Sequence, residues 1–375
     1  MAGNVAKRPN GKWRARYRDE AGQEHSRHFD RKVDAQRWLD EVTTSVVTGN
    51  YVEPKAGKIT FERFYAGWAP RQVWVPSTRL NADHATGSVP FADLPMNAIR
   101  RSHVEVWVKT MSIDLAPTTI KTRYVIVRSV FRAAVADRII ASDPSEGITL
   151  PRRRKQEAAM TIPTVNEVGR LVVNADSARV STRKGFRAYV ALCAFAGLRK
   201  GEAAAVQVGD IDFLRRQLTV SRQLQRDGSG YSIRPPKYGS ERVVYLPDEL
   251  VIILSEHVAA HVGESEPDRW LFTVGDDPLY DNAITWRWRA TRTAAKLPHV
   301  RLHDLRHFYA SGLIAAGCDV VTVQRALGHS TATTTLTTYS HLWPTAEDRT
   351  RAAASGLMRE ALGVAGRPAT PVSLA

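Results

Sequence analysis

The side chains best suited to chemistry lie in four short segments of this 375-residue chain, between residues 197 and 341. They supply two arginines, a lysine, two histidines and a tyrosine: Arg199, Lys237, His303, Arg306, His329 and Tyr339. Exchange of a phosphodiester needs an in-line nucleophile, cationic donors for the non-bridging oxygens and a proton for the leaving oxygen. This set offers a candidate for each role. The sequence shows no carboxylate cluster for Mg²⁺ and no P-loop, so it favours phosphoryl chemistry without a metal or another cofactor.

Arg199 lies at the end of an apolar helical pattern, in the segment Gly197-Leu198-Arg199-Lys200-Gly201-Glu202. Gly197 suits the left-handed position that closes a helix. Glu202 follows Arg199 by three positions and is expected to support its guanidinium. The alternative is that Arg199 and Glu202 form only a structural capping pair.

Lys237 lies between two strand-like runs, and the sequence predicts that it projects from the tip of a hairpin. A lysine at such a place is a candidate functional residue. The alternative is an ordinary solvated lysine in a loop.

His303 and Arg306 are three positions apart, which places both on one face of a predicted helix, where they can point at a single anion. The same segment has a second interpretation, because His303 and His307 have the spacing of the zinc motif HExxH. Asp304 in place of glutamate and the positive charge of Arg306 count against zinc, and no metal site is predicted.

The surrounding patterns predict an α+β protein of several domains. Residues 1–55 read as a small β-sheet packed on one helix, and residues 58–150 as a helical domain in which Val125, Val130, Phe131 and Ala134 point inward. Residues 69–97, rich in proline, are assigned to no element. A basic linker at 151–163 precedes a mainly helical catalytic domain at 164–350 with a small antiparallel sheet, and residues 351–375 read as a loose tail.

The net charge is +15, and its distribution indicates a polyanionic partner. Residues 1–155 hold 27 Lys and Arg against 16 Asp and Glu, whereas a bias toward arginine codons would spread the charge evenly. The candidate contacts to nucleic acid lie in the first sheet and in the linker: Lys12, Arg14, Arg16, Arg18, Arg152, Arg153, Arg154 and Lys155. Trp13, Ala15 and Tyr17 alternate with these arginines and are expected to face a core.

Two cysteines far apart in apolar surroundings, Cys193 and Cys318, predict neither a disulfide framework nor a metal site. The longest apolar run, residues 188–198, is too short to cross a membrane. These observations fit a reducing cytosol, and they predict neither secretion nor contact with a membrane.

In their order and spacing, the six candidate catalytic residues resemble the signature of the tyrosine recombinase, or phage integrase, family of the lambda-integrase type. That signature runs from an arginine through a hairpin lysine, an HxxR motif and a GH pair to a tyrosine, and here it spans about 140 residues. Residues 1–45 look like the family's arm-binding module, and residues 58–150 look like its helical core-binding domain. The match is weakest around residues 69–97.

The resemblance implies a role for each residue. Tyr339 would attack a scissile DNA phosphate, forming a 3′-phosphotyrosyl link and freeing a 5′-hydroxyl. Arg199 and Arg306 would hold the non-bridging oxygens, while His329 would add a hydrogen bond.

For the two proton transfers, the resemblance assigns Lys237 to the leaving 5′-oxygen and His303 to the proton of Tyr339. Because the covalent intermediate conserves the energy of the broken bond, a second strand can reseal it without ATP.

The sequence thus predicts an integrase that recombines double-stranded DNA at core and arm attachment sites as a homotetramer. An excisionase and a host DNA-bending protein are expected as further partners. A Xer-like chromosomal recombinase would share the chemistry but normally lacks the arm-like module. Two further hypotheses are a DNA-binding regulator without catalysis and a zinc hydrolase at His303 and His307.

Overall fold

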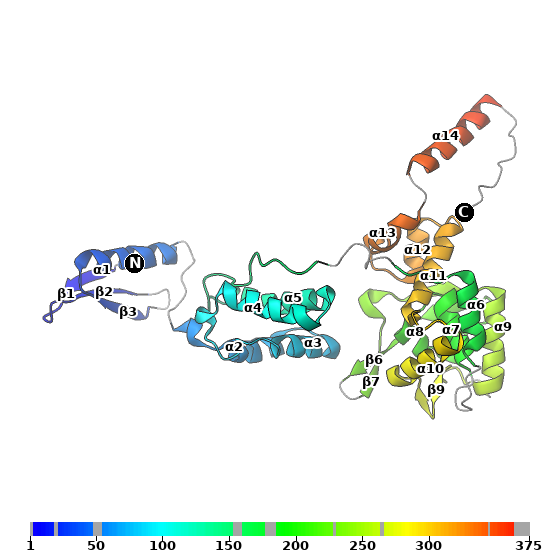
Figure 1. The fold of residues 1–375 in the computed structure, drawn as a ribbon, viewed down its shortest axis with the longest axis horizontal. Helices are drawn as coiled ribbons and strands as arrows, with labels where there is room; N and C mark the ends of the chain where they lie inside the picture. Colours follow the sequence, from blue (N-terminus) through cyan, green and yellow to red (C-terminus); the bar gives the residue numbers. More distant parts are fainter. Residues whose placement is uncertain are drawn as a thin grey trace. The chain divides into compact units, whose positions relative to one another are not determined.

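Strands at the start of the chain give way to helices that dominate the rest (Figure 1). The computed structural model describes residues 3–18, 22–47, 55–152, 160–176, 185–227, 230–262, 266–343 and 346–363. Contacts divide the chain into two units, Met1–Ala159 and Met160–Ala375. Within the described ranges every strand pair is antiparallel, so the predicted α+β class with small antiparallel sheets is confirmed.

The N-terminal module is a three-stranded sheet covered by one helix. Strands β1 (Asn4–Lys7), β2 (Trp13–Arg18) and β3 (Glu24–Phe29) pair in that order, and α1 (Lys32–Val47) packs on one face. Ala15 and Tyr17 are buried against Ala35 and Leu39 of α1. Successive residues of a strand point to opposite faces, so the predicted alternation is confirmed and the arginines of β2 lie on the other face.

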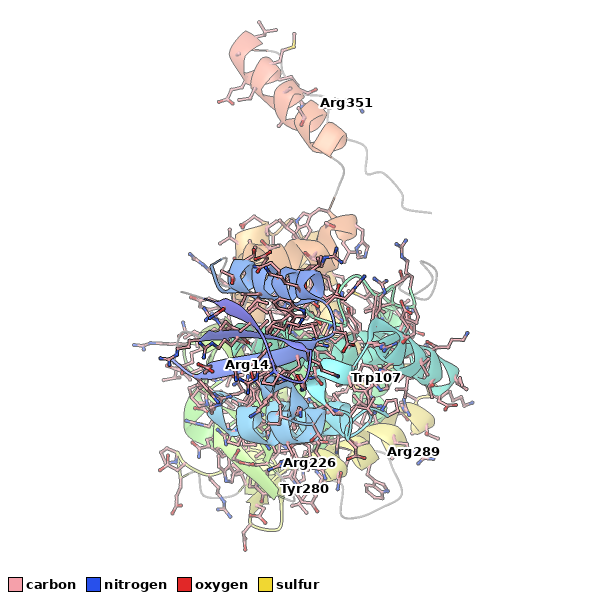
Figure 2. All side chains as sticks on the ribbon, turned by 90° about the vertical axis from the view of Figure 1, so that its left-hand side faces the viewer. Arg14, Trp107, Arg226, Tyr280, Arg289 and Arg351 are labelled. Atoms are coloured by element: carbon pink, nitrogen blue, oxygen red, sulfur yellow. The ribbon has the colours of Figure 1, made fainter. Side chains whose placement is uncertain are left out.

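Residues 55–152 contain four α-helices around one core rich in aromatic residues: α2 (Phe61–Trp68), α3 (Pro76–Thr86), α4 (Arg101–Asp114) and α5 (Pro117–Ala136). Figure 2 labels Trp107, whose indole is buried in this core and donates a hydrogen bond to the carbonyl of Ser88 at 3.0 Å. Residues 69–97, left unassigned by the sequence, include α3, which packs on α5. Phe91 and Met96 from the same interval are buried, so the interval belongs to the core.

One inward prediction for α5 is wrong. The side chain of Val125 is 53% exposed, whereas Tyr124 and Val127 are buried with Val130 and Phe131. A helix repeats every 3.6 residues, and the buried stripe through Tyr124, Val127 and Phe131 leaves Val125 one step outside it.

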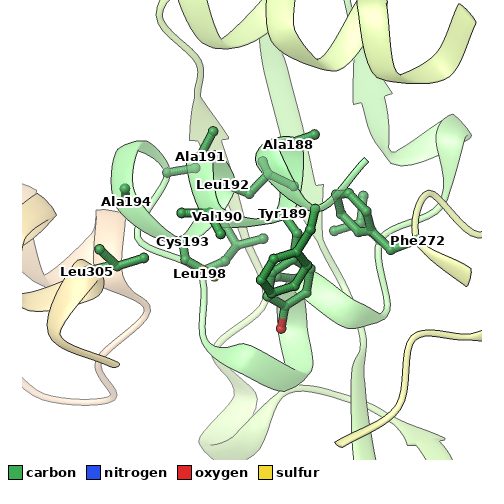
Figure 3. Packing of buried hydrophobic residues seen from close by; sticks show 14 of the residues in the cluster. Ala188, Tyr189, Val190, Ala191, Leu192, Cys193, Ala194, Leu198, Phe272 and Leu305 are labelled. Atoms are coloured by element: carbon green, nitrogen blue, oxygen red, sulfur yellow. The ribbon is translucent and has the colours of Figure 1, made fainter. Parts of the chain in front are cut away.

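The second unit is built around α7 (Phe186–Phe195), a helix that is apolar on nearly every side because it is buried on nearly every side. Figure 3 shows its residues 188–194 in the centre of the cluster, with Phe272 and Leu305 approaching from other segments. The helices around it are α6 (Val165–Asn174), α9 (Asp248–His257) and α11 (Leu302–Ala315), each in contact with α7. The remaining helices are α8 (Lys200–Ala204), α10 (Asp281–Ala294), α12 (Val320–Leu327), α13 (Ala332–Tyr339) and α14 (Ala346–Leu362).

Small sheets border this helical body. Strands β4 (Ile211–Asp212), β5 (Gln217–Val220) and β8 (Arg242–Tyr245) form one sheet, while β6 (Gln223–Asp227) and β7 (Gly230–Arg234) form a hairpin. A further short pair is β9 (Thr273–Val274) with β10 (Asp277–Pro278). The prediction that Lys237 sits at a hairpin tip is wrong. Lys237 begins a 3-10 turn between β7 and β8, which belong to different sheets, because Pro235 and Pro236 lead the chain out of the hairpin.

Helix α14 runs across the predicted end of the catalytic domain at residue 350, and residues 364–375 lie outside the described ranges. None of the described helices is long and apolar enough to span a bilayer.

Candidate active site

Arg199 is held in place by Glu202 at the start of α8. Its Nη1 donates to Glu202 Oε1 at 2.6 Å and to Ser240 Oγ at 3.1 Å, and its backbone N donates to Glu202 Oε2 at 3.0 Å. Arg242 donates to the same carboxylate at 2.9 Å. One buried carboxylate therefore orients two guanidinium groups, so Glu202 lies where a support of Arg199 must lie.

The Glu202 carboxylate is ionised because of its arginine partners. Burial by itself would raise its pKa, but the hydrogen bond from Arg242 and the charges of Arg242 and Arg199 lower the pKa from 4.5 to about 2. An ionised carboxylate that is 1% exposed is tolerable only with such partners.

Three arginines converge on the C-terminal end of α12. Arg242 Nε donates to the carbonyl of Ala326 at 2.9 Å, Arg306 Nη2 to that of Leu327 at 2.5 Å, and Arg199 Nη2 to that of Gly328 at 3.1 Å. The last carbonyls of a helix have no partner within the helix and carry partial negative charge. This helix end thus gathers cations from three distant segments immediately before His329.

Two glycines make these approaches sterically feasible. Gly328 ends α12 with φ +61°, and Gly197 ends α7 with φ +65°, both in the left-handed region that the sequence predicted for Gly197. A Cβ on Gly197 would lie 2.4 Å from the ring of Tyr309. The carbonyl of Gly197 accepts from Arg306 Nη1 at 2.5 Å.

An open cleft of about 610 Å³ lies beside this cluster, and its lining includes Arg199, Lys237 and His303. Lys237 and His303 are exposed, so both can reach a ligand in the cleft. Tyr280 and Arg226, labelled in Figure 2, line the same cleft. The lining of the cleft carries several cationic groups, among them Lys200 and Arg226.

Tyr339, at the end of α13, is 1% exposed, and it lies close enough to Arg306 for the charge of the guanidinium to affect its pKa. Its Oη is 2.8 Å from Nδ1 of His307. The ring of His329 lies nearly parallel to the Tyr339 ring, with centroids 6.4 Å apart, and His329 Nδ1 is 2.9 Å from Thr335 Oγ1. Burial raises the pKa of Tyr339 to about 12, and the charge of Arg306 opposes the rise.

The site therefore brings together all six predicted residues, since the arginines, His329 and Tyr339 form one cluster and the other two residues line the adjoining cleft. The sequence model of the phage integrase family matches residues 163–345, and that of the phage integrase N-terminal domain matches residues 1–48. Together the matches span more than half of the chain. The chain belongs to the phage integrase family of tyrosine recombinases.

Relatives of this integrase are distant but cover most of its length. The putative prophage phiRv2 integrase of Mycobacterium tuberculosis is 26% identical over 350 residues, which cover 88% of this chain and 89% of that protein. A tyrosine recombinase of Thermosipho africanus is 28% identical over 250 residues, covering 64% of this chain and 80% of that protein.

Solved structures show the same fold. The integrase of transposon Tn1549 in complex with a circular intermediate DNA superposes with a TM-score of 0.66 at 19% identity, covering 79% of this chain and 99% of that one. A lambda integrase tetramer bound to a Holliday junction gives a TM-score of 0.56 at 16% identity, with 91% and 95% covered.

Two residues of this integrase site received no role from the sequence. Arg242 begins strand β8, five positions after Lys237. An arginine in a strand gives no sequence signal that its side chain reaches Glu202 and the end of α12. The sequence pattern indicates His307 only as a candidate zinc ligand, whereas in the structure it contacts the oxygen of Tyr339. The sequence assigned that proton to His303, which makes ring contact with His307 at 4.8 Å.

The zinc interpretation gains no further ligand from the structure. Among the described residues no group of three His, Cys, Asp or Glu side chains has a metal-binding arrangement.

The predicted DNA-contact residues fall in both described and undescribed parts. Arg14, Arg16 and Arg18 share the outer face of β2, where Arg16 and Arg18 each lie within 4 Å of Glu24. Lys12 pairs with Asp30 at 3.6 Å, and Arg152 is exposed. Arg153, Arg154 and Lys155 lie outside the described residues.

Proposed function

We propose that this integrase cuts and rejoins double-stranded DNA at attachment sites through a 3′-phosphotyrosyl intermediate. The observation that carries the proposal is the convergence of Arg199 and Arg306 on adjacent carbonyls of α12, with Tyr339 in the same cluster. Two guanidinium groups at one place form a site for a tetrahedral anion beside a nucleophile.

Cleavage follows from these positions. Tyr339 Oη attacks the scissile phosphorus while Arg199 and Arg306 bind the non-bridging oxygens, each contributing on the order of 10² to 10³ in rate if it acts as an oxyanion-hole donor does. His329 adds a hydrogen bond to the same phosphate. Lys237, exposed at the cleft, protonates the leaving 5′-oxygen. Because Tyr339 is buried, DNA binding must bring phosphate and phenol together.

Strand exchange then needs no other energy source. The phosphotyrosyl bond keeps the free energy of the broken phosphodiester, so the 5′-hydroxyl of a second strand reverses the step. The net result is integration of the element, and excision is the same chemistry on the product sites.

The assembly proposed is a homotetramer on core sites, with residues 1–55 on separate arm sites. The lambda integrase of the same fold is a tetramer on a Holliday junction, which supports this stoichiometry. An excisionase and a host DNA-bending protein are proposed as further partners, acting in the bacterial cytoplasm on the nucleoid. The linker cations at 152–155 are proposed to contact phosphates, which would make DNA affinity fall with salt.

A nicked core site tests the chemistry, because loss of the short 5′-fragment traps the covalent complex. We expect wild type to form a DNA adduct that survives denaturation. We expect Tyr339→Phe to bind the site with unchanged affinity and form none, since only the nucleophilic oxygen is removed. An adduct in the Phe variant would contradict the assignment of Tyr339.

The same assay separates the proposal from a regulator and from a zinc enzyme. A DNA-binding regulator without catalysis predicts no wild-type adduct at any nicked site to which the protein binds. A zinc hydrolase predicts loss of activity in chelator, whereas the proposed mechanism predicts full activity there.

A further inference from the structure

We propose that His307 is a catalytic residue of this integrase, holding the phenolic oxygen of Tyr339 and accepting its proton during DNA cleavage. The inference rests on the proposed function. In the removal of the proton from Tyr339, His307 takes the place of His303, to which the family resemblance assigned this step. His303 keeps a place at the cleft, where it can bind phosphate.

His307 contacts the oxygen of Tyr339 that would react with DNA. His307 Nδ1 lies 2.8 Å from Tyr339 Oη. This is hydrogen-bond distance, which a general base needs from the atom whose proton it removes. In the tautomer with hydrogen on Nε2, the Tyr339 hydroxyl donates to Nδ1. The rings meet edge to face with centroids 5.6 Å apart, so the imidazole presents its edge to the phenol.

Tyr339 needs a base in direct contact to remove its proton. With a pKa of about 12, on the order of one Tyr339 in 10⁵ is ionised at pH 7. The side chain is 1% exposed, so bulk water does not reach the oxygen to take the proton.

The other two histidines of the site are poorly placed for this proton. His329 stacks its ring face on the phenol ring at an interplanar angle of 12° and engages Nδ1 with Thr335. His303 is exposed in the lining of the cleft, and within the described part of the chain it makes no hydrogen bond to Tyr339.

The surroundings of His307 keep it able to accept a proton. Burial lowers its pKa, Asp304 opposes this, and Arg301 and Arg306 lower the pKa further. These groups lie on or beside α11, and Tyr339 faces His307 from α13. The imidazole is therefore neutral at pH 7 and gains its proton only as the phenolate forms.

The step balances without an outside reactant. The Oη–P bond forms as the P–O5′ bond breaks. The phenolic proton moves to His307 Nδ1, and the 5′-oxygen takes a proton from Lys237. Religation runs the same transfers backward and restores neutral His307 and protonated Lys237.

The test measures single-turnover adduct formation by the full chain on the nicked core site. In His307→Asn, Oδ1 takes the place of Nδ1 and accepts the hydrogen bond but not the proton. We expect cleavage at pH 7 to fall by roughly 10² to 10⁴, with DNA affinity unchanged. The residual rate should rise about tenfold per pH unit, as the phenolate population does below its pKa.

Two chemical substitutions separate proton acceptance from packing. Replacing Tyr339 with difluorotyrosine, whose phenol is more acidic, should restore far more rate in His307→Asn than in wild type. Replacing the bridging 5′-oxygen with sulfur gives a leaving group that needs no proton, so it should restore Lys237→Ala but not His307→Asn. His303→Gln is the matched control, with no increase in its response to difluorotyrosine.

Several outcomes would overturn the inference. Cleavage by His307→Asn at or above the wild-type rate would show that the hydrogen bond to Tyr339 only holds the tyrosine in its buried position and takes no part in cleavage. A lower rate with wild-type pH dependence and no gain from difluorotyrosine would show a packing role. If His307→Asn does not fold, His307→Gln is measured in the same way. Absence of a wild-type adduct would instead contradict the proposed function.

Discussion

Glu202 links two arginines of the site, because its two oxygens contact both Arg199 and Arg242. Its charge makes the arginine cluster stable, since like charges would otherwise repel in a buried place. Sequence spacing predicted the contact to Arg199. The contact to Arg242 depends on how β8 packs and had no local signal.

Replacing Glu202 with Gln should destabilise the catalytic unit in a pH-dependent way. A carboxyl whose pKa falls from 4.5 to about 2 on folding stabilises the protein above pH 4.5, and this contribution is lost as the pH falls toward 2. Up to about 3 kcal/mol is at stake. Calorimetry of the full chain should show a lower unfolding temperature for Glu202→Gln at pH 6 and a difference of about half that size or less near pH 3.

Glu249→Gln is the control, because Glu249 is exposed on α9. It should differ from wild type by less than about 1 kcal/mol at pH 6, the size of the effect of a charge in the first turn of a helix. A Glu202→Gln difference that stays constant with pH would show that shape, and not charge, explains the effect.

At the scale of elements, the C-terminal end of α12 brings together three arginines of the candidate site. Its carbonyls bind Arg199, Arg242 and Arg306, which come from the start of α8, from β8 and from α11. The helix ends there because Gly328 adopts φ +61°. The GH pair is therefore a structural device as well as the source of His329.

Gly328→Ala should lower both stability and cleavage rate. A left-handed conformation costs a residue with a Cβ roughly 1–2 kcal/mol, and the new Cβ would lie 2.9 Å from Arg242 Nη1 and 3.1 Å from Ser240 Cβ. We expect a lower unfolding temperature and a reduced single-turnover rate, because the carbonyl that Arg199 binds would move.

Gly169→Ala is the matched control, since Gly169 lies in α6 and no atom of a neighbouring group lies within 4 Å of the place that a Cβ would take. It should stabilise the protein by roughly 0.5–1 kcal/mol and leave cleavage unchanged. Equal rates in Gly328→Ala and wild type would contradict the role given to this helix end.

At the scale of the whole molecule, most of the net positive charge lies in the first 155 residues. These residues carry +11 of the net +15, whereas a few arginines of the second unit cluster around one helix end. The outward arginines of β2 are a part of this charge that the N-terminal module presents on its sheet.

Deleting residues 1–55 should abolish binding to arm sites and recombination that depends on them, while cleavage of a nicked core site persists. A chromosomal recombinase of the Xer type predicts no second DNA site to lose. The measurement is binding to separate core and arm fragments at several salt concentrations.

Replacing Arg14, Arg16 and Arg18 with Gln is the milder companion, because these side chains point away from the core of Ala15 and Tyr17. If each contacts a phosphate, the slope of log affinity against log salt for the arm site should fall by roughly three. An unchanged slope would place this face away from DNA.

The sequence by itself indicated the family and predicted most of the elements. Side-chain types in a fixed order limit the chemistry. The period of 2 reveals which face of β2 is buried, and the period of 3.6 placed Val130, Phe131 and Ala134 of α5 correctly but not Val125. These signals are local, so they do not depend on how distant segments pack.

Only the tertiary structure decided which groups meet. His303 and His307 are one helical turn apart, and the packing of α13 determines that His307 reaches Tyr339. Arg199 binds a carbonyl 129 residues away, and residues 69–97 complete a core through α3. Such contacts arise when whole elements bury their apolar faces, which no pattern within one segment contains.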